Sequence, residues 1–348
     1  MSAPRIVAVD PRVDPRWRKL VAGPNGSLFT SPEWIDAVCG TYGFTPQARI
    51  AVGDRGEPLG GFAWVPVSDL RGDRLCSLPF CDRADPVVGD DRMWNALVDG
   101  VLTSDVRLSL RCLRSSAPLH EPRLVATGEA AWHGTPLCPD VEELRRRISG
   151  RARRNISLAE RNGVKVEMCT GLDAVRDFHR LHVSLRKRKY RLLAQPLEFF
   201  ERIWAAFAPR DAVLTLLAWA DGEPVAGAMF LIWNDVLYYK FGASLPEYLR
   251  FRPNHAIWWT AMRWGAERGL RLVDWGLSDL DQPGLVGFKQ QWGSEEQRIV
   301  TLRSPGRSSP TQAEADRLLN EVTQLLVDDS VPDEITTRAG ELLYRYFC

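Results

Sequence analysis

The sequence predicts an α+β protein made of two consecutive domains. The chain has 348 residues, more than one domain usually needs, and 45% of them are hydrophobic, which is enough for large cores. Two stretches separated by about 166 residues resemble each other, and helical and strand-like segments are mixed along the chain. These three observations favour two compact α+β units.

The internal similarity has two collinear parts. Residues 56–59, Gly-Glu-Pro-Leu, align with residues 222–225, Gly-Glu-Pro-Val, at an offset of 166 (222 minus 56). Upstream, Glu-Trp at 33–34 aligns with Glu-Phe at 198–199 at an offset of 165. A common turn motif after a helix is the alternative explanation, but two matches in register favour a duplicated domain. Each copy would contain an amphipathic helix, an apolar strand, a glycine-containing turn and a second apolar strand.

The second copy has the clearer secondary-structure signals. Asp221-Gly222 is a strong hairpin signal between apolar runs, and Asn234-Asp235 turns the chain again, so we expect a three-stranded meander. Asn254 opens and Gly269 closes a run with helical spacing. The expected elements are a helix at 195–207, strands at 212–220, 223–233 and 236–244, a helix at 254–269, and strands at 271–277 and 298–303.

The last segment, from residue 311, has a different character. Acidic residues dominate between residues 314 and 341, and the apolar residues follow a helical pattern. We expect an acidic helical tail that packs on the second domain. The predicted domains are therefore 1–142, 143–310 and the tail at 311–348.

Composition limits the class of protein. The formal net charge is +1, so no global charge favours nucleic acid or a membrane surface. The seven cysteines are scattered without metal-binding spacing, and His179 with His182 lacks a third ligand, so we expect reduced thiols and no metal site. No leader-like segment or run of 18 apolar residues occurs, which predicts a soluble cytoplasmic protein without a membrane span. The sequence does not indicate an oligomeric state.

Two basic segments stand out locally. Residues 145–165 contain eight basic residues and one acid, and residues 180–191 contain six basic residues and no acid. A solvated basic surface is one interpretation. The other is a single positive groove for phosphate, because arginine offers paired donors to phosphate oxygens.

The segment from Asp274 to residue 297 is the third candidate. A buried strand ends near Asp274, and a loop rich in glycine and proline leads to Lys289, which lies between aromatic residues. Loops at strand ends often carry reactive groups, and an ammonium can stabilise a phosphate or an oxyanion. An ordinary surface lysine and a structural aspartate are the alternatives. No hydrolase elbow, Walker loop, dinucleotide fingerprint or zincin motif occurs, so group transfer without a dedicated cofactor fits best.

The order of these motifs resembles the FemABX-like branch of the GNAT acyltransferase superfamily. The segments RARRNISLAERNGV, YYKFGAS, NHAIWWTAMRWGAERGL, VDWGL and GFKQQWG carry the resemblance, which is specific from about residue 145 to 303. It implies two tandem GNAT-like domains, each a mixed, mostly antiparallel sheet flanked by helices, followed by the helical tail. It also implies transfer of an aminoacyl or acyl group to an amine.

The resemblance suggests roles for particular residues. Lys289 occupies the place of the family's lysine, and we assign it to the oxyanion or to phosphate. Asp274 or His255 would receive the amine proton, and Tyr239 and Ser278 would orient the reactants. The expected substrate-binding residues are Arg153, Arg154, Arg186, Arg188, Lys240, Arg250, Arg252 and Trp292.

The sequence leaves two classes of acyl donor as alternatives. A CoA-binding GNAT domain has a glycine-rich loop before the helix, but this chain has Asn254 and His255 there, which favours aminoacyl-tRNA over acyl-CoA. The tRNA-dependent members often carry a coiled-coil arm, which this chain lacks. The leading hypothesis is aminoacyl transfer from tRNA to an amine of a cell-wall precursor or a peptide-like metabolite. The alternatives are an acyl-CoA-dependent N-acetyltransferase and a non-catalytic module that binds RNA or a phosphorylated ligand.

Overall fold

The computed structural model describes residues 4–102, 105–113, 116–306 and 311–348. Its contacts divide the chain into two units. The first comprises residues 1–131, 297–320 and 345–348, and the second comprises residues 132–296 and 321–344. The chain thus passes between the units four times. Three consecutive domains at 1–142, 143–310 and 311–348 stay a prediction.

The first unit contains a sheet with the strand order β1-β2-β3-β4-β5-β12. All its neighbouring strands are antiparallel except β4 and β5, which are parallel. Its strands are β1 (Arg5–Val9), β2 (Gln47–Val52), β3 (Pro58–Asp69), β4 (Gly72–Cys76), β5 (Arg107–Leu113) and β12 (Glu295–Arg303), which starts in the second unit. Its helices are α1 (Pro15–Val21), α2 (Pro32–Tyr42) and α3 (Asp91–Val98).

The second unit repeats this plan around strands β11-β10-β9-β8-β7. Its strands are β6 (Val125–Pro136), which starts in the first unit, β7 (Lys165–Cys169), β8 (Val213–Ala220), β9 (Glu223–Trp233), β10 (Val236–Ser244) and β11 (Leu272–Asp279). Its helices are α4 (Val141–Arg147), α5 (Gly150–Arg161), α6 (Leu172–Arg188), α7 (Leu197–Phe207), α8 (Pro253–Glu267) and α9 (Pro283–Gln290). The C-terminal helices are α10 (Gln312–Leu326) and α11 (Asp333–Leu343).

The predicted duplication is visible in the connections. In each unit an antiparallel meander is followed by a helix and a strand that returns parallel to the last meander strand. These strands are β2, β3, β4 and β5 in the first unit and β8, β9, β10 and β11 in the second. The α+β prediction of two similar units is therefore confirmed.

The hairpin turns of the second unit form for the reason that the sequence indicates. Asp221 and Gly222 have φ values of 53° and 85°, and Asn234 and Asp235 have 49° and 58°. Two consecutive positive φ values define the turn that matches strand twist, and Asp, Asn and Gly adopt them most readily. These turns fix the register of β8, β9 and β10.

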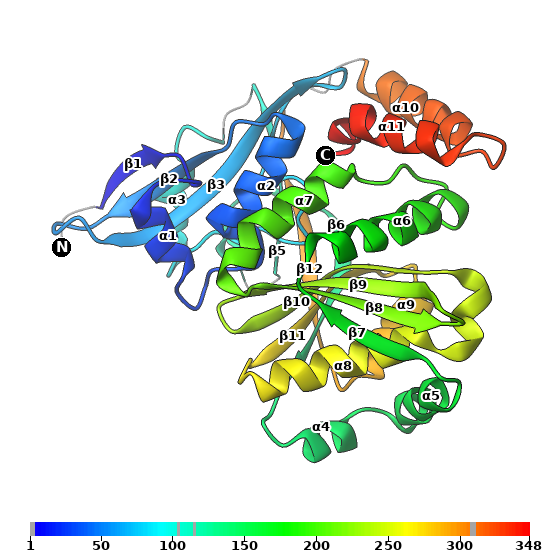
Figure 1. Cartoon of the computed structure of the whole chain (residues 1–348). Helices are drawn as coiled ribbons and strands as arrows, with labels where there is room; N and C mark the ends of the chain where they lie inside the picture. The colour runs from blue at the N-terminus through cyan, green and yellow to red at the C-terminus, as the bar shows by residue number, and fades with distance from the viewer. Residues whose placement is uncertain (1–3, 103–104, 114–115, 307–310) are drawn as a thin grey trace. The chain divides into compact units, whose positions relative to one another are not determined.

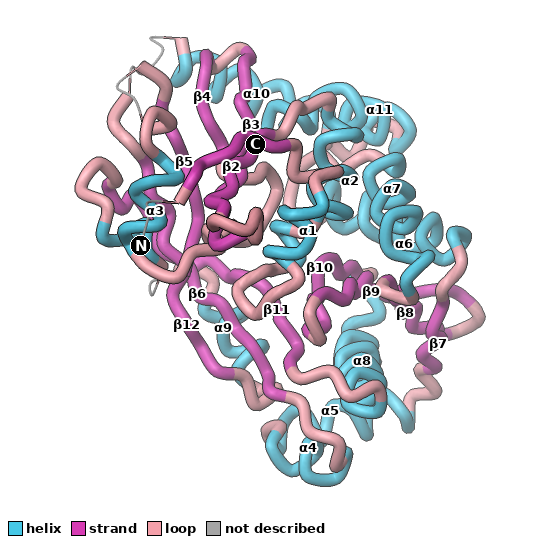
Figure 2. The backbone as a smooth tube through the Cα atoms, turned by 90° about the vertical axis from the view of Figure 1, so that its left-hand side faces the viewer, coloured by secondary structure: helices cyan, strands magenta, loops and turns pink. Residues whose placement is uncertain are grey.

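Helices cover both faces of this sheet (Figures 1 and 2). Gly227 of β9 faces α6, because a Cβ there would lie 3.0 Å from Phe178. Its neighbours Ala226 and Ala228 point the other way, into the core that contains Trp258 of α8. Side chains alternate along a strand, so α6 and α8 pack on opposite faces.

No helix of the described residues has the length and apolar character that a membrane span requires. All seven cysteines are free thiols.

Candidate functional site

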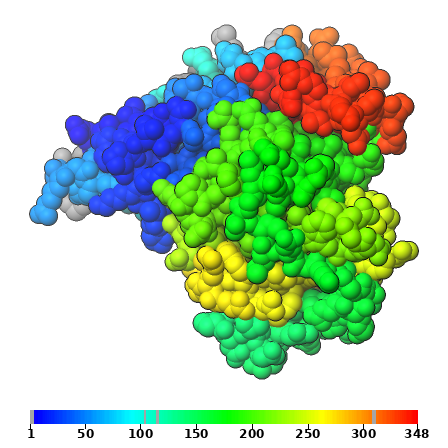
Figure 3. Space-filling model, viewed as in Figure 1, coloured from blue at the N-terminus to red at the C-terminus, as the bar shows by residue number. Residues whose placement is uncertain are grey.

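A pocket of about 240 Å³ lies at the N-terminal end of α8. Helix α5, the turn before α8 and helix α9 contribute its walls. In the space-filling view, α8 and the segment of α4 and α5 gather on the same side of the second unit (Figure 3). The lining residues are Arg151, Asn155, Leu249, Arg252, Pro253, Asn254, His255, Phe288 and Gln291.

His255 is the titratable group at the centre of this lining. Its side chain is 8% exposed, and Nε2 lies 3.0 Å from the amide nitrogen of Asn155. Burial, assisted by the positive charges of Arg252 and Arg151, lowers the pKa of His255 to about 4. The imidazole is therefore neutral at pH 7 and can accept a proton.

The start of α8 favours an anion. Arg252 occupies the N-cap position with φ 63°, and no side chain caps the helix. An uncapped helix N-terminus carries partial positive charge, and the exposed side chains of Arg151 and Arg252 add full charges. Pro253 has no N–H group, however, so the backbone offers one donor fewer than a glycine-rich loop would. Phosphate binding here depends mainly on the arginine side chains.

An aromatic cluster connects this pocket with the interior of the second unit. The His255 ring lies 5.1 Å from that of Phe288 and 5.7 Å from that of Trp292. Trp258 stacks on Trp275 at 4.0 Å, and the Tyr239 ring lies 4.9 Å from Trp258. These rings fix the His255 side chain within a rigid wall.

Tyr239 is half-buried at the far side of this cluster. Burial raises the pKa of Tyr239 to about 12, so its hydroxyl keeps its proton. A Cβ at Gly242 would lie 1.8 Å from that hydroxyl. Only glycine leaves room for the tyrosine in this position.

Asp274 lies within β11, which continues to Asp279, so the sequence expectation of a strand end near Asp274 is wrong. Lys289 of α9 contacts the backbone of the same strand. Lys289 is 3% exposed, and its Nζ donates to the carbonyl oxygens of Gly276 at 3.0 Å and Leu277 at 2.8 Å. Asp274 is also 3% exposed and accepts a hydrogen bond from the Gly276 N–H group at 2.8 Å. Both side chains thus hold the backbone around Gly276, which has φ 69°. Ser278 is 1% exposed, and its Oγ has no hydrogen-bond partner among the described residues.

The predicted catalytic residues therefore fall into separate groups. His255 lines the pocket, Tyr239 lies across the aromatic cluster, and Asp274, Ser278 and Lys289 are buried near β11. Lys289 is also in a helix, α9, where the sequence suggested only a loop. Pro283 fits the first turn of that helix, since its missing N–H has no partner to lose there. The catalytic roles of these five residues stay predictions.

The predicted substrate-binding residues differ in what they contact. Arg252 lines the pocket, and the exposed Arg250 lies over the Phe251 ring at 4.8 Å. Arg153 donates to three carbonyl oxygens at the end of α4, whereas Arg154 is exposed. The Lys240 ammonium lies 5.7 Å from the Phe241 ring. Trp292 is fully buried in the core.

The C-terminal segment holds the basic end of α6. Nη2 of Arg188 lies 3.0 Å from Asp333, and Lys187, which is 2% exposed, lies 2.8 Å from the same carboxylate. Arg191 pairs with Asp329 at 3.1 Å, and Arg186 donates to the carbonyl of Leu193.

The expectation of one positive groove is wrong. Helix α6 lies on one face of the sheet, whereas α5 packs on α8 at the other face. The two basic segments therefore cannot form one surface. The exposed basic side chains near the pocket come from α5 and the turn before α8.

Arg151, Asn155 and Gln291 line the pocket but were not selected from the sequence. Arg151 and Asn155 are four residues apart in α5 and so share one helix face. That spacing is readable in the sequence once α5 is placed, whereas the approach of Gln291 depends on the tertiary fold.

Part of the chain is similar in sequence to known proteins. Residues 144–289 match the model of the acetyltransferase (GNAT) domain family. Lipid II:glycine glycyltransferase from Staphylococcus aureus is 34% identical over 80 residues, which are 21% of this chain and 19% of that protein. The chain thus spans about a fifth of the length of this curated relative.

Solved structures are similar to this chain over both units. The crystal structure of FemX superposes with a TM-score of 0.68 and 17% identity, covering 91% of this chain and 100% of that chain. A tandem GNAT protein from the clavulanic acid biosynthesis pathway has a TM-score of 0.50 and 14% identity, covering 88% and 99%. At these identities the structures establish a shared fold, and they confirm the predicted fold of two tandem GNAT-like units.

Proposed function

We propose that the chain transfers an aminoacyl or acyl group to an amine, because residues 144–289 match the acetyltransferase (GNAT) domain family. The acceptor in this proposal is a cell-wall precursor or a peptide-like metabolite, and the donor is an aminoacyl-tRNA. The pocket at the start of α8, which places a neutral imidazole beside two arginines, is the observation that carries the proposal.

Each part of the pocket has a role in the proposed reaction. An amine attacks a carbonyl only when it is neutral, and it must lose a proton as the C–N bond forms. His255 accepts that proton at Nε2, where it replaces the hydrogen bond that the Asn155 amide donates in the resting site. Arg151 and Arg252 bind the phosphate of the donor. As the tetrahedral intermediate collapses, the C–O bond breaks and the ester oxygen leaves as a hydroxyl group, taking the proton held by His255.

Two observations support an aminoacyl donor over acyl-CoA. Pro253 removes a backbone donor from the loop where a pyrophosphate would need several. The matching segment of the curated relative comes from a protein named as a glycyltransferase. We therefore rank aminoacyl-tRNA first and acyl-CoA second.

Equilibrium titration of the full chain with charged tRNA and with acetyl-CoA, at low and moderate salt, tests the donor. We expect salt-sensitive binding of tRNA, because phosphate contacts release counterions, and weaker binding in Arg252→Gln. Arg92→Gln, at an exposed position on α3, is the matched control. Binding of acetyl-CoA alone would select the acyl-CoA-dependent alternative.

A transfer assay tests the reaction itself. Donor and an amine-bearing muropeptide are incubated with the protein, and mass spectrometry detects the added acyl or aminoacyl group. Transfer by the unmodified chain supports the proposal. Binding of tRNA without transfer to any amine would instead support the non-catalytic alternative.

A further inference from the structure

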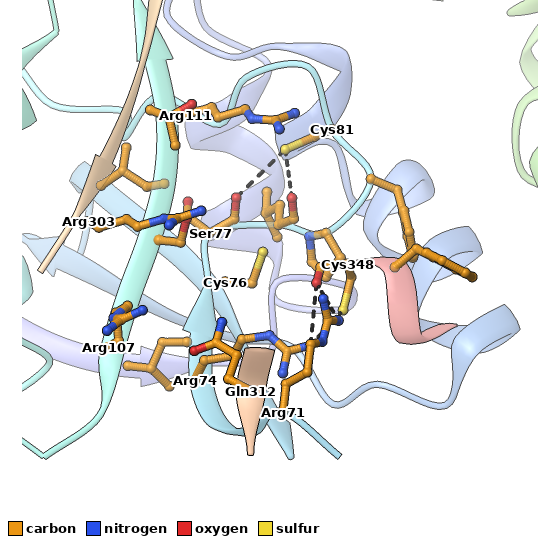
Figure 4. A pocket seen from close by; sticks show the side chains of 18 residues that line it. Arg71, Arg74, Cys76, Ser77, Cys81, Arg107, Arg111, Arg303, Gln312 and Cys348 are labelled. Carbon is orange, nitrogen blue, oxygen red and sulfur yellow. Dashed lines mark hydrogen bonds between the residues drawn. The ribbon is translucent and has the colours of Figure 1, made fainter. Parts of the chain in front are cut away.

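The first unit contains a second pocket, of about 290 Å³, with an unusual concentration of arginine. Strands β4, β5 and β12, the turn after β4 and the last residues of the chain line it. Figure 4 shows Arg107, Arg111 and Arg303 on one side and Arg71 and Arg74 on another. No acidic residue is among the described residues that line it.

Sheet geometry places these side chains on one face. In β5, Leu108, Leu110 and Cys112 are buried in the core beside α3, so Arg107, Ser109 and Arg111 point to the other face. Ser109 pairs with Arg303 of β12, and Arg107 pairs with Arg74 of β4. The opposed pair of arginines is unfavourable unless negative charge lies nearby, because like charges directly opposite each other on neighbouring strands repel.

Part of this charge is already balanced. Arg74 makes two hydrogen bonds to the Asp69 carboxylate, at 2.7 and 2.8 Å, and Arg71 donates to the backbone oxygen of Cys348 at 2.9 Å. Arg111 and Arg303 are exposed and form no ion pair within the part of the chain that the structure describes. Their guanidinium groups are therefore available to a ligand.

The thiols of Cys76 and Cys348 do not supply negative charge. Burial raises the pKa of the Cys76 thiol to about 12, and it also raises the pKa of the Cys348 thiol. Both thiols are neutral at pH 7. The positive charge of Arg111 and Arg303 is thus not offset by these two thiols.

We propose that this pocket binds a phosphate or diphosphate group, held by Arg111 and Arg303 against the β5–β12 surface. Arginine suits this ligand because its planar fork donates two parallel hydrogen bonds to phosphate oxygens. The site is distinct from the pocket at α8, and it does not depend on the reaction proposed there. The phosphate belongs either to a free small molecule or to a lipid headgroup.

Calorimetric titration of the full chain with inorganic pyrophosphate tests the site. We expect saturable binding that falls at least tenfold in Arg111→Gln/Arg303→Gln. The variant Arg151→Gln/Arg252→Gln, which removes charge from the α8 pocket, should retain most of this binding, and so should the surface control Arg92→Gln. Undiminished binding in Arg111→Gln/Arg303→Gln, or no binding to the unmodified chain, would overturn the proposal.

A conservative double variant distinguishes loss of the site from loss of folding. Arg111→Lys/Arg303→Lys keeps the charge but loses the fork, so we expect intermediate affinity with an unchanged circular dichroism spectrum. Pyrophosphate should also raise the melting temperature of the unmodified chain more than that of either double variant. Equal stabilisation of all three proteins would contradict the site.

Sedimentation with phosphatidylglycerol vesicles separates the two sources of phosphate. Sedimentation that requires Arg111 and Arg303 would support a lipid headgroup as the ligand. Pyrophosphate binding by the same residues without sedimentation would support a free phosphorylated molecule.

Discussion

At the scale of single residues, the pocket at α8 depends on the unusual state of His255. A histidine at a helix start usually titrates near neutrality, but burial and two arginines keep this one neutral well below pH 6. The sequence identifies His255 by its place in a motif. It does not reveal the contact with Asn155, which is 100 positions away in the chain.

We predict that His255→Gln reduces turnover about 100-fold to 10,000-fold, the usual contribution of a general base. Protonation of the acceptor amine lowers kcat/KM below the pKa of that amine. Because the neutral imidazole is the active form, the acid limb that belongs to His255 should add a further fall as the pH drops through about 4, and not near 6.5. A pH profile of the transfer reaction measures this.

The variant Arg252→Gln tests whether the neighbouring positive charge lowers the pKa of His255. Removing a neighbouring positive charge should raise the pKa of His255 and move the acid limb to higher pH. An acid limb that stays in place in this variant, or that lies near 6.5 in the unmodified chain, would contradict His255 as the base.

Lys289 gives a second prediction at this scale. Lys289→Met removes the donor from two carbonyl oxygens beneath β11, and each buried acceptor left unpaired costs about 1–3 kcal/mol. We expect a lower free energy of unfolding in urea than for Lys165→Met, an exposed control. Unchanged stability together with a loss of turnover above about 100-fold would instead favour the oxyanion role predicted from the sequence.

At the scale of elements, the sequence predicts what local patterns determine. The hairpins of β8, β9 and β10 and the helix α8 follow from turn residues and apolar spacing. Helix α9 is not predicted by this reasoning, since three of its eight residues are glycine or proline, which have low helix propensity. The basic end of α6 is the other failure. Charge counts along the sequence do not show that distant aspartates neutralise it.

The contact between α6 and the first residue of α11 yields a stability prediction. Lys187 is buried, and its hydrogen bond lowers the pKa of Asp333. Asp333→Asn leaves the Lys187 ammonium group without its counter-ion, so we expect the free energy of unfolding to fall by about 2–4 kcal/mol. This loss is smaller than for a fully buried ion pair, because the Asp333 side chain is 43% exposed.

Replacing both residues should cost less. In Lys187→Met/Asp333→Asn no buried charge remains, and part of the lost stability should return. Denaturant unfolding of the single and double variants measures the coupling. Additive losses would show that the two side chains do not depend on each other.

At the scale of the whole molecule, the duplicated plan was predictable because short matching segments keep their spacing across 166 positions. The boundaries of the units were harder to derive. Residues 299–303 of β12 pair with β5, although nearly all of the second unit separates them in the sequence. A division of the sequence into consecutive domains cannot assign β12 to the same sheet as β5.

This pairing predicts how fragments behave. A fragment of residues 1–131 exposes the edge of β5, whose unpaired backbone groups and apolar side chains favour aggregation. The same fragment joined through a glycine-serine linker to residues 297–320 should give more soluble protein and slower amide hydrogen exchange. Equal solubility and exchange of the two fragments would show that β12 is dispensable for the first unit.

The four passages between units also constrain the order of events during synthesis. Residues 297–303 leave the ribosome only after the whole of 132–296 has been made, so β5 waits for its antiparallel neighbour throughout that time. The second unit has its meander, helix α8 and the returning strand β11 complete by residue 279, well before that neighbour emerges. The sheet that is encoded first is therefore completed last, and translation speed across residues 132–296 sets how long its open edge needs protection.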